Sequence, residues 1–195
     1  MRYDMIIAGV GGQGILSIAT VIGQAVLDRG WRLKQSEVHG MAQRGGAVET
    51  HLRMADGAIA SDLIPLGKAS LILAMEPLEA LRYLPWLVPG GRVVANQATL
   101  ENMARYPDRE AVYAELRQLP GCLLFDAMEL ARNNGSARAV NMAVLGAAAP
   151  CLPLPALALE SAIAAQFRRK GEAVVNGNLA VFRAAHALGV ANAHS

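Results

Sequence analysis

The sequence predicts an α/β fold of three layers, in which a mainly parallel sheet carries helices on both of its faces. Apolar runs of strand length alternate with amphipathic or Ala-rich segments of helix length along most of the chain. A glycine-rich turn joins the first expected strand to the first expected helix. The 195 residues, 53% of them hydrophobic, contain no repeat or obvious linker, so we expect one domain over residues 1–195.

The strands are predicted from apolar runs bounded by turn residues. An apolar run at 3–9 predicts a buried strand, and apolar residues spaced i, i+3, i+4 and i+7 over 14–29 predict a helix that ends at Gly30. By the same reasoning, the remaining strands are expected at 31–38, 47–54, 69–75, 92–97 and 121–127.

The remaining helices lie mostly in the second half of the chain. Pro77 suits the first turn of a helix over 76–87, and Pro-Gly-Gly at 89–91 predicts a turn. Residues 98–118 are ambiguous and look partly helical. Further helices are expected at 127–136 (with its closing turn), 137–150, 155–170 and 172–189. This helix-rich final third is expected to cover one face of the sheet.

The turn after the first strand has the spacing of a dinucleotide-binding motif. Gly9, Gly11 and Gly14 follow G-x-G-x-x-G, and Gly12 adds a fourth glycine. Glycines allow a tight turn and close backbone approach, and free N–H groups at the helix start favour an anion. The fold is therefore expected to be Rossmann-like. Two other uses of the turn remain open: simple closure of a strand–helix unit, or contact with another subunit.

The second feature of a dinucleotide site is weaker. Such a site places an acidic residue about 20 residues further on, at the end of the second strand. Glu37 is the nearest candidate, but it lies near the end of the expected second strand, beside a loop. Arg32 and Lys34 would instead suit a 2′-phosphate. A stand-alone NAD(P)-dependent reductase and a non-catalytic nucleotide- or coenzyme A-binding protein therefore remain alternatives.

A polar loop, HGMAQRGG at 39–46, follows the second strand. Loops at the carboxyl ends of strands in an open α/β sheet sit together, so we expect this loop to lie beside the glycine turn. Arg44 carries a fork of donors that suits a phosphate or carboxylate, with glycine N–H groups beside it. His39 is a candidate acid–base group at the start of the loop.

Other polar residues have mainly structural interpretations. His51 is expected to share one side of a strand with Glu49 and Arg53, as a structural or an exposed histidine rather than an acid–base group. Glu76 is expected to cap a helix, with a place in the cleft at a strand's carboxyl end as the alternative. Asn141 is expected to bond a neighbouring helix or loop. The strand-end pair at 96–97 are candidates for lining the same crevice.

Composition excludes several classes of function. The net charge of +2 and the 5% of aromatic residues argue against nucleic-acid binding. Cys122 and Cys151 form no metal-binding pattern, so no zinc or iron–sulfur site is expected in this chain. The sequence shows neither a signal peptide nor a membrane helix, which predicts a cytoplasmic protein without membrane contact.

Two segments together resemble a known family. GVGGQGI at 9–15 and SEVHGMAQRGGAVETHLR at 36–53 are similar to the gamma-type subunit or domain of 2-oxoacid:ferredoxin oxidoreductases, in particular the beta subunit of the indolepyruvate form. Residues 138–148 and 178–189 resemble later segments of the family. The resemblance thus covers essentially the whole chain.

The resemblance implies a subunit of a complex that oxidatively decarboxylates 2-oxoacids to acyl-CoA and passes electrons to ferredoxin. Thiamine diphosphate, magnesium and iron–sulfur clusters are then expected in a large alpha subunit, with coenzyme A as co-substrate. This chain would hold no redox centre and no catalytic or metal-binding residue, and would be inactive alone. The residues then expected to contact a ligand or the partner's active site are Gly9, Gly11, Gly12, Gln13, Gly14, His39, Gly40, Met41, Gln43, Arg44, Gly45 and Gly46.

Overall fold

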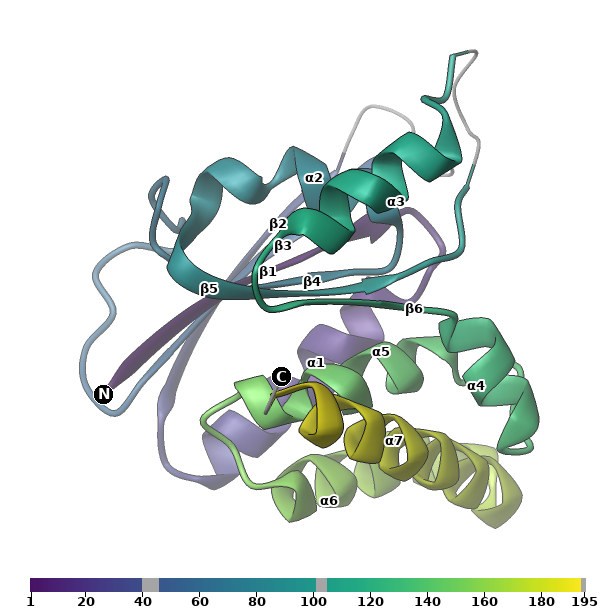
Figure 1. The fold of residues 1–195 in the computed structure, drawn as a ribbon. Helices are drawn as coiled ribbons and strands as arrows, with labels where there is room; N and C mark the ends of the chain where they lie inside the picture. The colour runs from purple at the N-terminus through teal and green to yellow at the C-terminus, as the bar shows by residue number, and fades with distance from the viewer. Residues whose placement is uncertain (40–45, 101–104, 194–195) are drawn as a thin grey trace.

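A sheet lies between two layers of helices in the computed structural model, which describes residues 1–39, 46–100 and 105–193 (Figure 1). Within these residues the sheet has six strands in the order β2-β3-β1-β4-β5-β6. The predicted three-layer α/β fold is confirmed. The strands are β1 Arg2–Val10, β2 Arg32–His39, β3 Ala47–Ala55, β4 Ala69–Ala74, β5 Leu87–Asn96 and β6 Cys122–Phe125.

The sheet is parallel from β1 through β4 and β5 to β6, whereas β3 runs antiparallel to both β1 and β2. The mainly parallel sheet is thus confirmed, with β3 inserted between the first two strands. Only residues 40–46 connect β2 to β3. A parallel connection needs a crossover of a dozen or more residues, so this short link requires an antiparallel pair.

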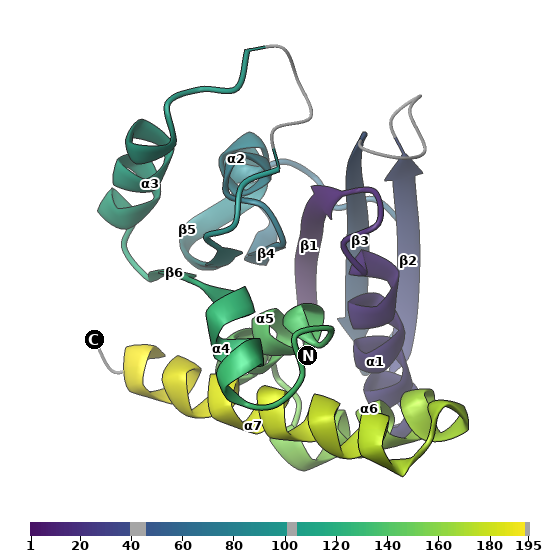
Figure 2. The same ribbon diagram turned by 90° about the vertical axis from the view of Figure 1, so that its right-hand side faces the viewer.

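The helices divide unequally between the two faces of the sheet (Figures 1 and 2). The predicted cover of one face by the helix-rich C-terminal third is confirmed, and there α5 and α7 make the most extensive helix–helix contact. One face carries α1 Ile15–Asp28, α4 Ala127–Asn133, α5 Val140–Ala148, α6 Ala156–Phe167 and α7 Glu172–Ala193. The other carries α2 Pro77–Arg82 and α3 Arg109–Gln118.

Two apolar cores result, one on each face of the sheet. Alternate residues of β1 enter them: Met5 and Ile7 on the α1 side, Ile6 and Ala8 on the α2 side. Burial on both faces explains why this strand is a continuous apolar run rather than an alternating one.

Polar side chains of β3 fix a segment without helix or strand, residues 56–68, to the α2 side of the sheet. Arg53 is buried; its Nε donates to Asp4 Oδ1 at 3.0 Å and its Nη1 to the Ser61 carbonyl at 2.8 Å. His51 Nδ1 accepts the Ile64 N–H at 3.0 Å. The buried guanidinium is thus compensated by a carboxylate and by backbone carbonyls, as a buried charge requires.

The predicted turn at 89–91 is wrong, because these residues lie within β5. Ala69 of β4 pairs with Leu87, and Leu71 already pairs with Arg92, so the register shifts across Pro-Gly-Gly. Gly90 has φ +76°, and the extra residues are accommodated as an irregularity within the strand. The expected helix at 76–87 is likewise shorter, ending at Arg82 and followed by a 3₁₀ turn over Leu84–Trp86.

The contact of α5 with α7 depends on two glycines. A Cβ at Gly146 would lie 2.3 Å from the Phe182 carbonyl oxygen, and one at Gly189 would lie 2.2 Å from the Ala147 carbonyl oxygen. The backbones of α5 and α7 are therefore in direct contact at these two glycines. This contact fixes how the two helices pack in the layer on the α1 side of the sheet.

We expect Gly146→Ala to lower the free energy of unfolding by about 1–3 kcal/mol, because the added methyl group meets backbone that must move. Urea unfolding measures the change. Gly23→Ala in α1 is the matched control, since its new Cβ meets only Leu33 Cδ2, at 3.0 Å. A loss no greater than that of Gly23→Ala would contradict the backbone contact.

Candidate functional site

The glycine turn lies at the carboxyl end of β1 and leads directly into α1. Gly12 and Gly14 adopt φ +101° and +84°, a region that favours glycine. Gln13 closes the turn on itself: its Oε1 accepts the Val10 N–H at 2.8 Å, and its own N–H donates to the Val10 carbonyl at 3.1 Å. A Cβ at Gly9 would lie 2.7 Å from this Oε1. Gly9 and Gln13 therefore shape the turn.

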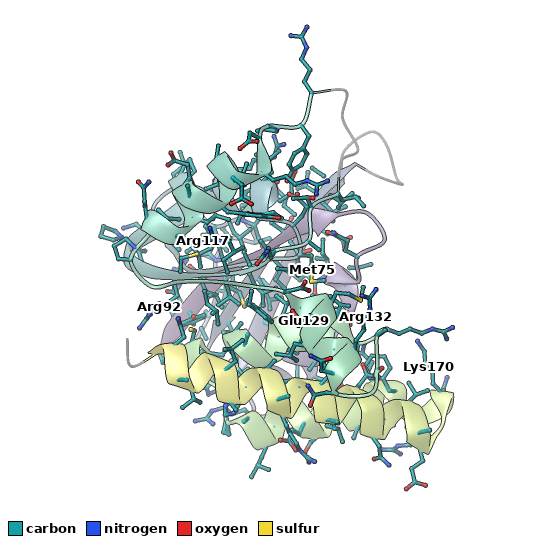
Figure 3. The ribbon with its side chains drawn as sticks, turned by 45° about the vertical axis from the view of Figure 1, so that its right-hand side comes forward. Met75, Arg92, Arg117, Glu129, Arg132 and Lys170 are labelled. Carbon is teal, nitrogen blue, oxygen red and sulfur yellow. The ribbon has the colours of Figure 1, made fainter. Side chains whose placement is uncertain are left out.

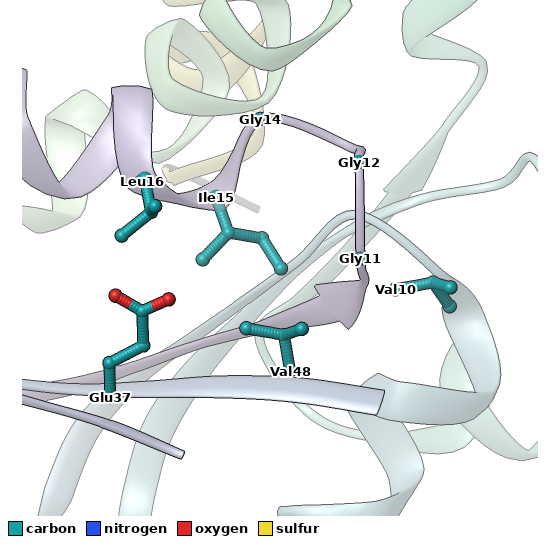
Figure 4. A pocket seen from close by; sticks show the side chains of 8 residues that line it. All are labelled: Val10, Gly11, Gly12, Gly14, Ile15, Leu16, Glu37 and Val48. Carbon is teal, nitrogen blue, oxygen red and sulfur yellow. The ribbon is translucent and has the colours of Figure 1, made fainter. Parts of the chain in front are cut away.

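A pocket of about 260 Å³ opens beside the turn (Figure 4). Three of the predicted glycines line it, together with apolar residues and the Glu37 carboxylate, which extends from β2 toward the start of α1. Leu16 is 50% exposed at its edge. The lining residues are Val10, Gly11, Gly12, Gly14, Ile15, Leu16, Glu37 and Val48.

A hydrogen bond joins the two sequence segments that carry the family resemblance. The Gly11 N–H donates to the Gly46 carbonyl oxygen at 2.9 Å. The predicted proximity of the glycine turn to the second loop is thus confirmed at Gly46. His39 ends β2, while the predicted contacts Gly40, Met41, Gln43, Arg44 and Gly45 lie outside the described residues.

The pocket differs from a conventional dinucleotide site in two respects. The Gly11 N–H is already paired with Gly46. In addition, β3 separates β2 from β1, so Glu37 lies two strand spacings away, about 10 Å in the sheet plane, rather than one. A ribose-binding acid belongs on the strand adjacent to β1, which makes this arrangement a poor match for a dinucleotide.

Val48 and Leu16 line the pocket but were not among the residues predicted from sequence. Val48 lies opposite Gly9 in the β1–β3 register. The short 40–46 connection predicts a hairpin of β2 and β3, but it does not say which of these strands lies beside β1, so the sequence contains no signal for Val48. Leu16 gave no signal, since its exposure depends on how α1 packs.

Asn141 of α5 supports the turn from the far side of α1. Its Nδ2 donates to the Gly14 carbonyl at 3.4 Å, a long bond that confirms the expected link to a neighbouring loop. A Cβ at Gly14 would lie 2.7 Å from this Nδ2. The turn is therefore enclosed by α5 as well as by β3.

Two other polar residues singled out in the sequence, Glu76 and Asn96, have structural roles. Glu76 caps α2 by accepting the Glu79 N–H at 3.0 Å, as expected, and also pairs with the Tyr106 hydroxyl. Asn96 is buried; its Nδ2 donates to the Met75 carbonyl at 3.3 Å, and its Oδ1 accepts the Ala127 N–H at 3.1 Å. Asn96 thus ties strand ends together and does not line the pocket.

His51 is buried on the opposite side of the sheet from the pocket, within 3.7 Å of the Glu49 carboxylate. Burial lowers the pKa of His51, and the Glu49 carboxylate opposes that shift. The neutral ring accepts the Ile64 N–H through Nδ1. This pattern confirms the structural role expected for His51.

The part of the chain that the structure describes contains no group of three His, Cys, Asp or Glu residues placed to hold a metal ion. None of its helices is long and apolar enough to cross a membrane.

Comparison with known proteins decides the family. The family described as pyruvate ferredoxin/flavodoxin oxidoreductase matches residues 4–188. The chain belongs to this family. It is 37% identical over 190 residues to the indolepyruvate oxidoreductase subunit IorB of Methanothermobacter thermautotrophicus, covering 94% of this chain and 95% of that protein.

Solved structures share the fold of this pyruvate ferredoxin/flavodoxin oxidoreductase family member. The gamma subunit of a keto/oxoacid ferredoxin oxidoreductase from Geobacter sulfurreducens matches with a TM-score of 0.69 at 22% identity, covering 97% of this chain and 99% of that one. A 2-oxoglutarate:ferredoxin oxidoreductase from Magnetococcus marinus matches with a TM-score of 0.76 at 21% identity, covering 97% of this chain but 31% of that longer chain.

The two positive-φ glycines of the turn provide a matched pair of substitutions. Gly12→Ala should lower the free energy of unfolding by about 1–2 kcal/mol through backbone strain alone, because nothing lies within 4 Å of a Cβ added at this position. Gly14→Ala should cost about 1–3 kcal/mol more through its clash with Asn141. Chemical denaturation in the Asn141→Ala background tests this: the excess cost at Gly14 should disappear, and its persistence would rule out the α5 contact.

Acid should destabilise the fold partly through His51. Because its folded pKa lies below the usual 6.5, the unfolded state binds the proton more readily, so stability falls as pH decreases below about 6.5. His51→Asn retains an acceptor for Ile64 without titrating there. The urea midpoint of this variant should fall less than that of the wild type between about pH 7.5 and 5.5. An equal fall in both proteins would exclude His51 as a source of acid sensitivity.

Proposed function

We propose that this chain is the small subunit of an indolepyruvate-type ferredoxin oxidoreductase. The complex would convert an arylpyruvate and coenzyme A to acyl-CoA and carbon dioxide, passing two electrons to ferredoxin. The observation that carries the proposal is the 37% identity to IorB over nearly the full length of both proteins. The shared fold with gamma subunits of this enzyme class supports it.

The proposal places thiamine diphosphate, magnesium and iron–sulfur clusters in a large alpha subunit. A cluster held by cysteines takes four thiolates, and this sequence contains two cysteines in all. Burial raises the pKa of the Cys122 thiol to about 11 and also raises that of Cys151, which disfavours the thiolate that a metal requires. In a cytoplasmic setting both thiols would stay reduced.

In this account the glycine-turn pocket faces the partner and admits part of coenzyme A. The start of α1, where no side chain caps the helix, favours an anion. The matching Magnetococcus marinus enzyme has coenzyme A bound in its structure. The two departures from dinucleotide geometry, at Gly11 and Glu37, favour this use over that of a stand-alone NAD(P)-dependent reductase.

A second carboxylate at the pocket edge should impair coenzyme A use. We expect Leu16→Glu to raise the KM for coenzyme A about tenfold in the assembled complex with a smaller effect on kcat, because the new charge adds to that of Glu37 and repels phosphates. Steady-state assays of dye or ferredoxin reduction measure both constants.

Leu27→Glu is the matched control for Leu16→Glu. Leu27 lies on the same helix and is 56% exposed, but it lies at the other end of α1 and does not line this pocket. Its variant should retain the wild-type KM. Equal effects of the two substitutions, or no effect of Leu16→Glu, would contradict a role for this pocket in coenzyme A use.

A further inference from the structure

A second pocket lies on the other side of the first turn of α1. Its volume is about 240 Å³. Ser17 contributes from α1, Asn141 from α5 and Asn178 from α7, and the apolar side chain of Phe167 forms part of the lining. The remaining polar lining comes from Arg138 and Lys170. Lys170 lies at the end of the fold where α7 begins (Figure 3).

The charge in this pocket is one-sided. Arg138 and Lys170 are its ionisable lining residues, and both are cationic. Lys170 Nζ lies 5.3 Å from the centre of the Phe167 ring, and neither cation has a carboxylate partner within residues 1–39, 46–100 and 105–193. Arg53, Arg82 and Arg183, in contrast, all form ion pairs.

The polar groups around these cations suit the oxygens of an anion. Ser17 supplies a hydroxyl in the first turn of α1, where the helix dipole is positive. Asn141 and Asn178 supply side-chain amides; Asn178 is 6% exposed, and its Nδ2 is fixed by donation to the Val174 carbonyl at 2.7 Å. Four different segments of the chain thus place polar side chains around one volume.

We propose that this pocket binds a phosphate group, either inorganic or carried by a larger ligand. A guanidinium fork and an ammonium group provide charge-assisted hydrogen bonds to phosphate oxygens, and the hydroxyl adds a neutral donor. The volume is smaller than that of most sites for whole drug-sized ligands, so the pocket accepts a group rather than an entire cofactor. This assignment stands independently of the proposed oxidoreductase function.

Titration of the full-length chain with inorganic pyrophosphate at low ionic strength tests the proposal by calorimetry. We expect one saturable site whose affinity falls about three- to tenfold in Lys170→Gln and again in Arg138→Gln, because each variant loses one charged contact. Both side chains are exposed, so thermal unfolding without ligand should be unchanged. The rise in Tm caused by pyrophosphate should shrink in both variants.

Arg169→Gln is the control, since Arg169 is exposed beside Lys170 but does not line the pocket. Its pyrophosphate affinity should stay within about twofold of the wild-type value, because an exposed charge outside the pocket makes no direct contact with the ligand. Equal weakening by Arg169→Gln would indicate nonspecific attraction and overturn the proposal, as would undetectable binding to the wild type. Competition by coenzyme A would identify a nucleotide-borne phosphate as the ligand, and saturation without competition would identify inorganic phosphate.

Discussion

The hydrogen bond from the Gly11 N–H to the Gly46 carbonyl oxygen joins the end of β1 to the start of β3. It depends on β3 lying between β1 and β2 and running antiparallel to both strands. The short connection at 40–46 accounts for the antiparallel direction of the β2–β3 pair. From this one insertion follow the distance of Glu37 from the glycine turn, the position of Val48 in the pocket and the polar face of β3. The buried Asp4–Arg53 pair then fixes the following segment to that face.

The same insertion changes what the glycine turn can bind. A G-x-G-x-x-G turn ordinarily offers its N–H groups to a diphosphate and relies on an acid from the adjacent strand for the ribose. Here the Gly11 N–H is paired with backbone, and the acid lies one strand further out. The start of α1 still favours an anion, but the pocket beside it is open and edged by an exposed leucine. That geometry supports the proposed contact with a partner subunit.

The alternation of strands and helices could be predicted because each buried strand is a continuous apolar run, as in β1 and β4. The capping role of Glu76 and the structural role of His51 also followed from local patterns. Strand order could not be predicted, because the short connection at 40–46 fixes β2 and β3 as an antiparallel pair but leaves open which of the two strands lies beside β1. Pro-Gly-Gly at 89–91 predicted a turn because its local chemistry is that of a turn, whereas pairing of β5 with β4 on both sides carries the strand through it. The cationic pocket was not foreseen, because its residues come from four segments far apart in the sequence.

Reconstitution with the proposed large subunit tests the central claim most directly. The measurement is reduction of ferredoxin that depends on both an arylpyruvate and coenzyme A, made with this chain alone, with the large subunit alone and with the two combined. The account predicts full turnover only for the combined subunits and none for this chain alone. Full turnover by the large subunit without this chain, or reduction of a substrate by this chain alone with NADH, would contradict it.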